Sequence, residues 1–233
     1  MEPQNDPETQ ARLNAYVARL ASADLNVTGT RDPEALRIDH VGDALTLLPL
    51  LPPPLPPGGP GGPDVSDAPV LRLVDIGSGG GLPGIPLAIA RPDLRVTLLE
   101  ATARKVGFLE SCARTLDLPG VTVCGQRAEE AGHDPDLRER FDLATCRAVG
   151  ALREILEYTL PLLKVGGVLL APKAKTAAEE IAAASTALQK LGGAVPTIHS
   201  TGAGDRVVVR VVKERPTPDG WPRRPGRPRK SPL

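Results

Sequence analysis

Aromatic residues are scarce in this chain of 233 residues, which contains one Trp, two Tyr and two Phe. So few rings argue against a sheet or channel that stacks nucleic-acid bases on aromatic side chains. The core must be aliphatic instead, and the 41% of hydrophobic and 24% of charged residues are ordinary for a folded protein. The length suits one α/β domain with a small extension.

Cysteine is also rare. Cys112, Cys124 and Cys146 stand far apart and form no Cys-x-x-Cys or Cys/His cluster, so no metal site is expected. An odd number of separate cysteines fits a reducing compartment. Long apolar runs are missing too, because the longest, 44–51, is too short to cross a membrane. The acidic first residues resemble neither a signal nor a transit peptide, and we expect a cytoplasmic protein without a membrane partner.

Net charge is zero, but the charge is unevenly distributed. Residues 213–233 carry seven basic and two acidic side chains, so this end is +5 and the remainder −5. Such a tail is either an arm that binds a polyanion or a solvated surface segment, and charge alone does not distinguish the two.

The pattern along the chain changes near residue 70. Apolar residues at helical spacing predict a helix over 8–22, and the acid–Pro–acid start at Asp32 predicts a second helix to about Leu48. Nine prolines then exclude regular structure over 49–69. We therefore divide the chain into an N-terminal helical extension (1–48), a Pro/Gly-rich linker (49–69), a main domain (70–213) and a basic Pro/Arg-rich tail (214–233).

Strands alternate with helices in the main domain. Alternation of this kind implies a doubly wound, mostly parallel sheet, here of seven strands, whose strand ends meet at one edge where ligands bind. The strands are expected at 70–75, 95–100, 121–124, 141–146, 168–171, 194–199 and 206–212, and helices at 85–89, 104–116, 150–163 and 176–191.

A glycine-rich loop, Asp75-Ile-Gly77-Ser-Gly79-Gly-Gly81, follows the first expected strand. A dinucleotide-binding fingerprint would need a small residue at the next position, which is Leu82, and the Lys of a Walker loop is absent. A dehydrogenase is therefore disfavoured. The pattern acid-x-Gly-x-Gly-x-Gly resembles the first motif of class I S-adenosylmethionine (SAM) methyltransferases.

Two acidic residues, Glu100 and Glu129, stand at or just after the ends of the next two strands. Glu100 ends the second strand, where a carboxylate can accept both ribose hydroxyls of SAM; otherwise it is an exposed strand-end acid. Ala128 and Glu129 follow the third strand. Their N–H groups or the Glu129 carboxylate can read the adenine edge, but acidic residues are also common at a helix N-terminus, and the sequence leaves both interpretations open.

A second resemblance runs through most of the chain. It is carried by residues 74–86, 26–34 with His40, 105–109, 127–130, 146–148, 172–173, 222–226 and 230–233. These segments resemble the bacterial small-subunit (16S) rRNA guanine-N7 methyltransferases, the RsmG or GidB family, which has the Rossmann-like fold of class I SAM-dependent methyltransferases. The chain departs from the family at 40–45, which reads His-Val-Gly-Asp-Ala-Leu where a His-Leu-Leu-Asp-Ser-Leu-like run is common, and in its proline-rich insert.

The resemblance implies transfer of a methyl group from SAM to N7 of one guanine in 16S rRNA, in the small ribosomal subunit. We also expect a monomer that needs no metal. Guanine N7 is an unprotonated acceptor, so no general base is expected. Arg147, at the end of the fourth strand, is expected to position the guanine or SAM. The cofactor-binding residues expected from the loop and the resemblance are Asp75, Gly77, Gly79, Gly81, Leu82, Glu100, Ala128, Glu129 and Arg147.

Basic residues are the candidates for RNA contact, and the −5 body favours a shaped ribonucleoprotein over naked RNA. The alternatives are a SAM-dependent methyltransferase acting on another RNA or a small molecule, and a binding module without activity. A nucleophilic Cys146 is disfavoured, because the Pro-Cys context is missing. The residues expected to contact RNA are Lys173, Arg223, Arg224, Arg227, Arg229 and Lys230.

Overall fold

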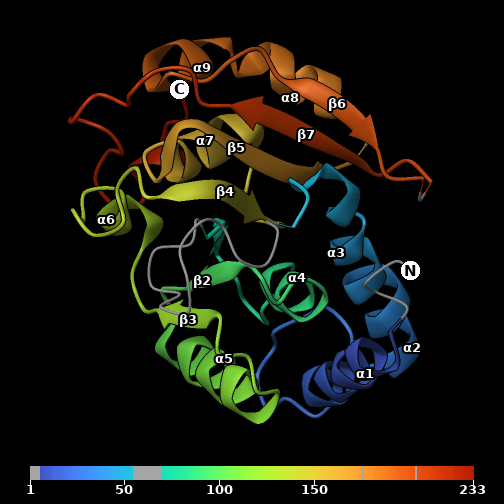
Figure 1. The fold of residues 1–233 in the computed structure, drawn as a ribbon. Helices are drawn as coiled ribbons and strands as arrows, with labels where there is room; N and C mark the ends of the chain where they lie inside the picture. Colours follow the sequence, from blue (N-terminus) through green and yellow to red (C-terminus); the bar gives the residue numbers. More distant parts are fainter. Residues whose placement is uncertain (1–5, 55–69, 175, 203) are drawn as a thin grey trace, which may run out of the picture.

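The computed structural model describes residues 6–54, 70–174, 176–202 and 204–233. The strands within these residues are Arg72–Ile76 (β1), Arg95–Leu99 (β2), Val121–Cys124 (β3), Phe141–Cys146 (β4), Leu163–Lys173 (β5), Thr197–Ser200 (β6) and Val207–Val212 (β7). They form one sheet in the order β3-β2-β1-β4-β5-β7-β6 (Figure 1). Strands β1 to β5 pair in parallel, and β7 is antiparallel to β5 and β6. The expected mostly parallel seven-stranded α/β fold is confirmed.

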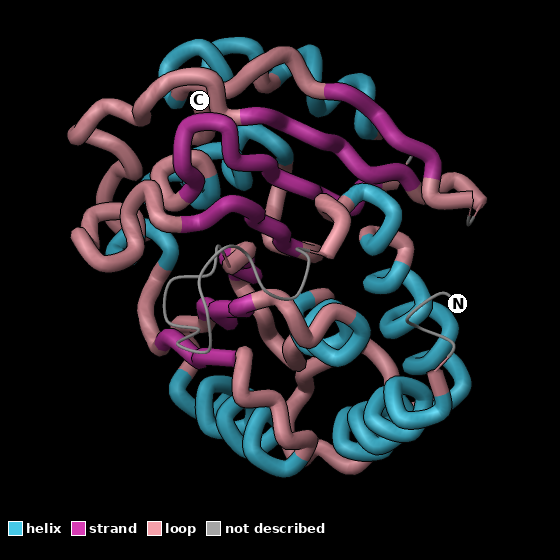
Figure 2. Tube along the Cα trace, viewed as in Figure 1, coloured by secondary structure: helices cyan, strands magenta, loops and turns pink. Residues whose placement is uncertain are grey.

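Helices cover both faces of the sheet, as Figure 2 shows. The longer and later helices are Pro7–Ala21 (α1), Gly84–Ala90 (α4), Ala103–Thr115 (α5), Ala128–Ala131 (α6), Leu152–Thr159 (α7), Ala177–Ala183 (α8), Ser185–Leu191 (α9) and Arg227–Lys230 (α10). One apolar cluster joins α1, α4 and α5 to Leu73 and Leu98 of the sheet. A second joins α7, α8 and α9 to Val74 and Leu99. Because both faces are covered, the central strands are apolar almost throughout.

The N-terminal helix packs on the first of these clusters. Asp6 caps α1 by accepting a hydrogen bond from the Thr9 N–H at 3.0 Å. Tyr16 and Leu20, on its apolar face, are 0% and 1% exposed. The predicted helix over 8–22 is confirmed, and its packing makes it part of the same core as the sheet.

The second N-terminal helix is not the regular helix that the sequence predicts. It consists of Pro33–Ala35 (α2), a π-helical turn Leu36–Gly42 (η2), Asp43–Leu45 (α3) and a 3₁₀ turn Leu48–Leu50 (η3). The expectation that 49–69 holds no regular element is wrong at its start, where η3 continues into the buried Leu51. Residues 55–69 lie outside the described residues.

The C-terminal half differs from the expected elements: α7 is shorter than the helix expected over 150–163, and β6 begins at Thr197 rather than near 194. Strand β5 runs through the turn expected at 165–167, with a register shift against β4. The helix expected over 176–191 is divided into α8 and α9 at Ala184. Residues after β7 fold back on the domain, with Thr217, Pro222 and Pro228 buried. No helix among the described residues is both long and apolar enough to span a bilayer.

Candidate cofactor site and the pocket beside it

The ends of β1, β2, β3 and β4 lie level with one another. Ile76 of β1 pairs with Leu99 of β2 and with Cys146 of β4, and Leu99 pairs with Cys124 of β3. The residues that follow these strands therefore meet at one edge of the sheet, as parallel strands require. They include the glycine loop (residues 77–81), Glu100, Ala128 and Arg147.

The glycine loop has a shape that side chains would not permit. Gly77, Gly79 and Gly81 have φ of +67°, +59° and +98°, in the left-handed region that favours glycine. A Cβ at Gly81 would overlap Ile85, and one at Gly84 would overlap Leu98. The loop thus presents backbone close to any ligand at the end of β1.

Asp75 lies behind this loop, fully buried. Its Oδ2 accepts a hydrogen bond from the Gly84 N–H at 3.1 Å, and its Oδ1 has no partner among the described residues. Burial raises the pKa of this carboxyl to about 7. Since buried polar atoms are nearly always paired, an orphaned acceptor beside a glycine loop fits a ligand that brings a donor, such as the ammonium group of SAM.

Glu100 connects the end of β2 to the same loop. It is 7% exposed, and its two oxygens accept hydrogen bonds from the N–H groups of Gly79 at 3.0 Å and Thr102 at 2.8 Å. A carboxylate has lone pairs beyond these two bonds, so it can still accept from ribose hydroxyls.

Two pockets lie at this edge and share Gly77. The small pocket, of about 220 Å³, is lined among others by Glu100, Ala128, Glu129 and Tyr158. The large pocket, of about 750 Å³, is lined by Gly79, Leu82, Arg147 and residues of the N-terminal segment. Asp75 and Gly81 are buried behind the loop and line neither pocket. Seven of the nine expected cofactor residues therefore line one of the two pockets.

Arg147 is held by the N-terminal segment. Its Nη2 lies 2.8 Å from His40 Nδ1, and its Nη1 lies 3.6 Å from Asp43 Oδ2. Because arginine only donates, Nδ1 of His40 is the acceptor and carries no proton. Burial and then the Arg147 charge lower the pKa of His40, which keeps the ring neutral.

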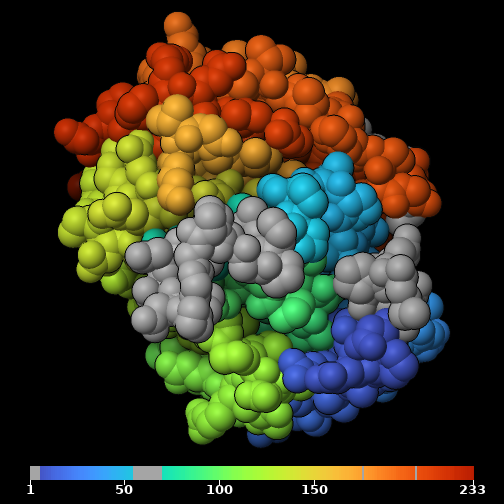
Figure 3. Space-filling model, viewed as in Figure 1, coloured from blue at the N-terminus to red at the C-terminus, as the bar shows by residue number. Residues whose placement is uncertain are grey.

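Arg206, which precedes β7, was not singled out by the sequence. Its guanidinium contacts Asp43 and Asp39, both at 3.2 Å, so η2 and α3 are joined to the β6–β7 hairpin. Figure 3 shows these N-terminal residues (cyan) bordering C-terminal ones (orange) on one face. Lys105 also lines the large pocket, which therefore carries three cations beside two carboxylates. His40 is one of the residues that carry the family resemblance, so the sequence pointed to it, whereas nothing in the sequence pointed to Arg206.

Two residues expected to contact RNA have partners within the protein. Lys173 donates to Glu180 at 2.7 Å and to the Gly150 carbonyl at 2.8 Å. Arg223 forms an ion pair at 2.6 Å with Glu157, which is fully buried. The others, all exposed, are Arg224, Arg227, Arg229 and Lys230, of which Arg229 lines the small pocket.

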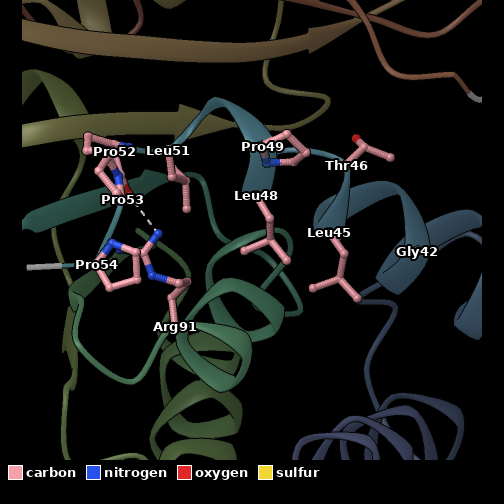
Figure 4. Close-up of a pocket in the computed structure, with 10 residues that line it drawn as sticks. All are labelled: Gly42, Leu45, Thr46, Leu48, Pro49, Leu51, Pro52, Pro53, Pro54 and Arg91. Carbon is pink, nitrogen blue, oxygen red and sulfur yellow. Dashed lines mark hydrogen bonds between the residues drawn. The ribbon is translucent and has the colours of Figure 1, made fainter. Parts of the chain in front are cut away.

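The remaining candidates offer no competing chemistry. Burial raises the pKa of Cys146 to about 12, so its thiol is protonated at neutral pH and unsuited to attack. No group of three or more His, Cys, Asp or Glu among the described residues could hold a metal ion. An apolar cavity of about 620 Å³ (Figure 4) has Arg91 as the only charged side chain in its described lining. Arg91 is paired with Asp93 and the Pro52 carbonyl.

Known proteins resemble this chain over most of its length. The family model for rRNA small subunit methyltransferase G matches residues 9–209. Relatives named ribosomal RNA small subunit methyltransferase G occur in Roseiflexus castenholzii (45% identical over 165 residues, 70% of each chain) and in Chloroflexus aggregans (42% over 211 residues, 89% of this chain and 82% of the relative). One from Sorangium cellulosum is 42% identical over 224 residues, 95% of this chain and 86% of the relative.

Solved structures support the fold alone. The methyltransferase SibL in its apo form has a TM-score of 0.57 at 17% identity, over 85% of this chain and 62% of SibL. The Methanococcus jannaschii fibrillarin pre-rRNA processing protein has a TM-score of 0.50 at 13% identity, over 63% of this chain and 68% of that one. Both are similar to this chain in the arrangement of the sheet and its helices.

Proposed function

The chain belongs to the rRNA small subunit methyltransferase G family, and we propose on that basis that it transfers a methyl group from SAM to N7 of one guanine in 16S rRNA. The observation that carries this proposal is the pair of pockets that share Gly77. The small pocket offers Glu100 for a ribose, and the large pocket is open beside Arg147. A ligand that spans the glycine loop would place its reactive centre between them.

The reaction needs positioning more than proton transfer. Bound SAM supplies the methyl group as a sulfonium. Guanine N7 carries a lone pair and no proton, so the N–C bond forms as the C–S bond breaks and its electron pair stays on sulfur. No side chain has to remove a proton. The neutral ring of His40 and the carboxylate of Asp43 hold Arg147 at the large pocket, where its guanidinium can donate to guanine O6 and align N7 with the methyl group.

RNA would approach through the large pocket. Lys105, Arg147 and Arg206 line it and can contact phosphates, and the exposed tail cations Arg224 and Lys230 add a second basic surface. Lys173 and Arg223 would first have to leave Glu180 and Glu157. We propose that the protein acts in the cytoplasm as a monomer on the small ribosomal subunit, a folded particle that presents the target loop.

The direct test is to incubate the protein with methyl-labelled SAM and small ribosomal subunits that lack the modification, with naked 16S rRNA in parallel. We expect label on one N7-guanine, mainly in the particle. Arg147→Gln should lower kcat at least tenfold, whereas Arg104→Gln, exposed on α5, should leave it unchanged. Absence of label in both samples, with SAM bound, would instead assign another RNA or a small molecule as the substrate.

A further inference from the structure

The C-terminal tail is anchored to the domain by specific contacts. Arg138 donates to the carbonyls of Thr217 at 2.6 Å and Trp221 at 2.8 Å. Arg223 donates three hydrogen bonds to the carboxylate of Glu157 on α7, at 2.6 to 2.9 Å. Glu157 is fully buried, and Arg223 is its ion-pair partner. Thus the tail has a defined place on the domain.

The residues after this anchor reach the cofactor site. The Gly226 N–H donates to Glu129 Oε1 at 2.8 Å, and Gly226 has φ of +78°, which favours glycine. Gly226 and Arg229 line the small pocket together with Glu100 and Tyr158. Between them, Pro228 is buried. The tail therefore supplies one side of the pocket that Glu100 and Ala128 line from the sheet.

We propose that Gly226 and Arg229 form a wall of the adenosine half of the SAM site, and that docking of this wall and binding of SAM stabilise each other. The inference rests on the proposed function in taking the small pocket as the place of the adenosine. It assigns Arg229 to the cofactor site and Arg223 to the anchor that holds this wall in place, although the sequence offered both residues to RNA. Such coupling is reciprocal: if docking raises SAM affinity by a given factor, SAM favours docking by the same factor.

The first test compares two tail arginines in the full chain. Arg229→Ala and Arg224→Ala each remove one positive charge from an exposed tail residue, but only Arg229 lines the pocket. By isothermal titration calorimetry we expect Arg229→Ala to weaken SAM binding about fivefold. We expect Arg224→Ala, which removes a cation of the exposed basic surface of the tail, to leave SAM affinity within twofold. Equal SAM affinities in the two variants would overturn the proposal.

The second test disturbs the wall without touching its anchor. A Cβ at Gly226 or at Gly220 would meet no atom within 4 Å, but only Gly226 has a positive φ. Gly226→Val therefore acts on the backbone conformation, and Gly220→Val is its matched control. We expect Gly226→Val to weaken SAM and S-adenosylhomocysteine binding by the same factor, about tenfold, because the two ligands share the adenosine. Thermal unfolding without ligand should stay close to that of the unaltered chain.

Trp221 reports on the docking itself, since it is the single tryptophan of the chain and lies in the tail, 5.2 Å from the Arg223 guanidinium. SAM should protect Trp221 from acrylamide quenching in the unaltered chain, because Trp221 and the wall belong to one continuous segment of the tail. A purely structural tail would give no such response, and that result would overturn the coupling. If the unaltered chain binds no SAM, the proposed function fails with it; if SAM binds equally to all variants, only the coupling fails.

Discussion

The two pockets of the site are bordered by opposite ends of the chain, and different kinds of contact hold these ends in place. Beside the large pocket, α1 holds the glycine loop from within the core: the Tyr16 hydroxyl donates to the Gly80 carbonyl at 2.7 Å, and Leu20 lies against Gly80. Beside the small pocket, the tail is held by the Arg223–Glu157 ion pair and by the Gly226 N–H.

The difference has a consequence for what each end can do. Tyr16 and Leu20 belong to the same apolar cluster as the sheet, so the loop keeps its shape as long as the protein is folded. The tail adds fewer buried apolar groups and relies on polar contacts, chiefly the Arg223–Glu157 ion pair and the hydrogen bond from Gly226 to Glu129. Segments of that kind open at lower free energy than the core. We therefore expect a pre-shaped loop in the large pocket and an adjustable wall in the small one.

The largest effect should come from filling the loop. Gly79→Arg places a long side chain at the large pocket from a residue with φ of +59°, and we expect SAM affinity to fall at least 1,000-fold, about 4 kcal/mol. Gly107→Arg is the control, because that glycine is exposed on α5 with open space around it. Calorimetry should show unchanged SAM binding in the control; SAM binding retained by Gly79→Arg would contradict the loop assignment.

The next effect concerns pH and the buried carboxyl behind the loop. The pKa of Asp75 is about 7 in the folded state against an ordinary 3.8, so the folded state holds this proton more tightly. Stability without ligand should therefore fall as pH rises from about 4 to about 7 and then level off. The fall is roughly 4 kcal/mol at most. Asp75→Asn should flatten this dependence in urea unfolding at pH 5 and pH 8, and an unchanged slope would exclude Asp75 as its source.

A smaller effect on stability compares the two pockets directly, through one tyrosine hydroxyl beside each. Tyr16→Phe leaves the Gly80 carbonyl without its donor in the core, which should cost about 1–3 kcal/mol of stability and weaken SAM binding severalfold. Tyr158→Phe is the counterpart in the small pocket, where the hydroxyl makes no hydrogen bond to another described residue. Chemical unfolding should show almost no change there. Equal losses in the two variants would remove the distinction between a rigid loop and an adjustable wall.

What the sequence predicts well is local. The glycine loop follows a strand, and level ends of parallel strands then bring Glu100, Ala128 and Arg147 together without further information. The pattern therefore predicted which residues meet at this edge of the sheet. Helix 8–22 was equally clear, because its apolar residues repeat at helical spacing.

What the sequence does not predict are contacts between residues that lie far apart along the chain. Arg206 meets Asp43 across 163 positions, and Arg223 meets Glu157 across 66, and no local pattern announces either pair. A run of basic residues looks the same whether its partner is RNA or a buried glutamate. The π-turn η2, which presents His40 to Arg147, also departs from the regular helix that capping signals suggest.

The smallest effect on SAM affinity should come from Glu100, which lines the small pocket and contacts the loop of the large one. Its carboxylate accepts hydrogen bonds from the Gly79 N–H of the loop and from the Thr102 N–H after β2. Glutamine offers one acceptor oxygen, so Glu100→Gln leaves one of these donors without its partner. Water from the adjoining pocket can replace that bond, and the loss in SAM affinity should be about fivefold, about 1 kcal/mol. Calorimetry with SAM and with adenosine alone locates the loss: equal factors assign it to the ribose, and a loss for SAM only assigns it to the loop. Unchanged affinity for both ligands would contradict a role for Glu100 in holding the cofactor.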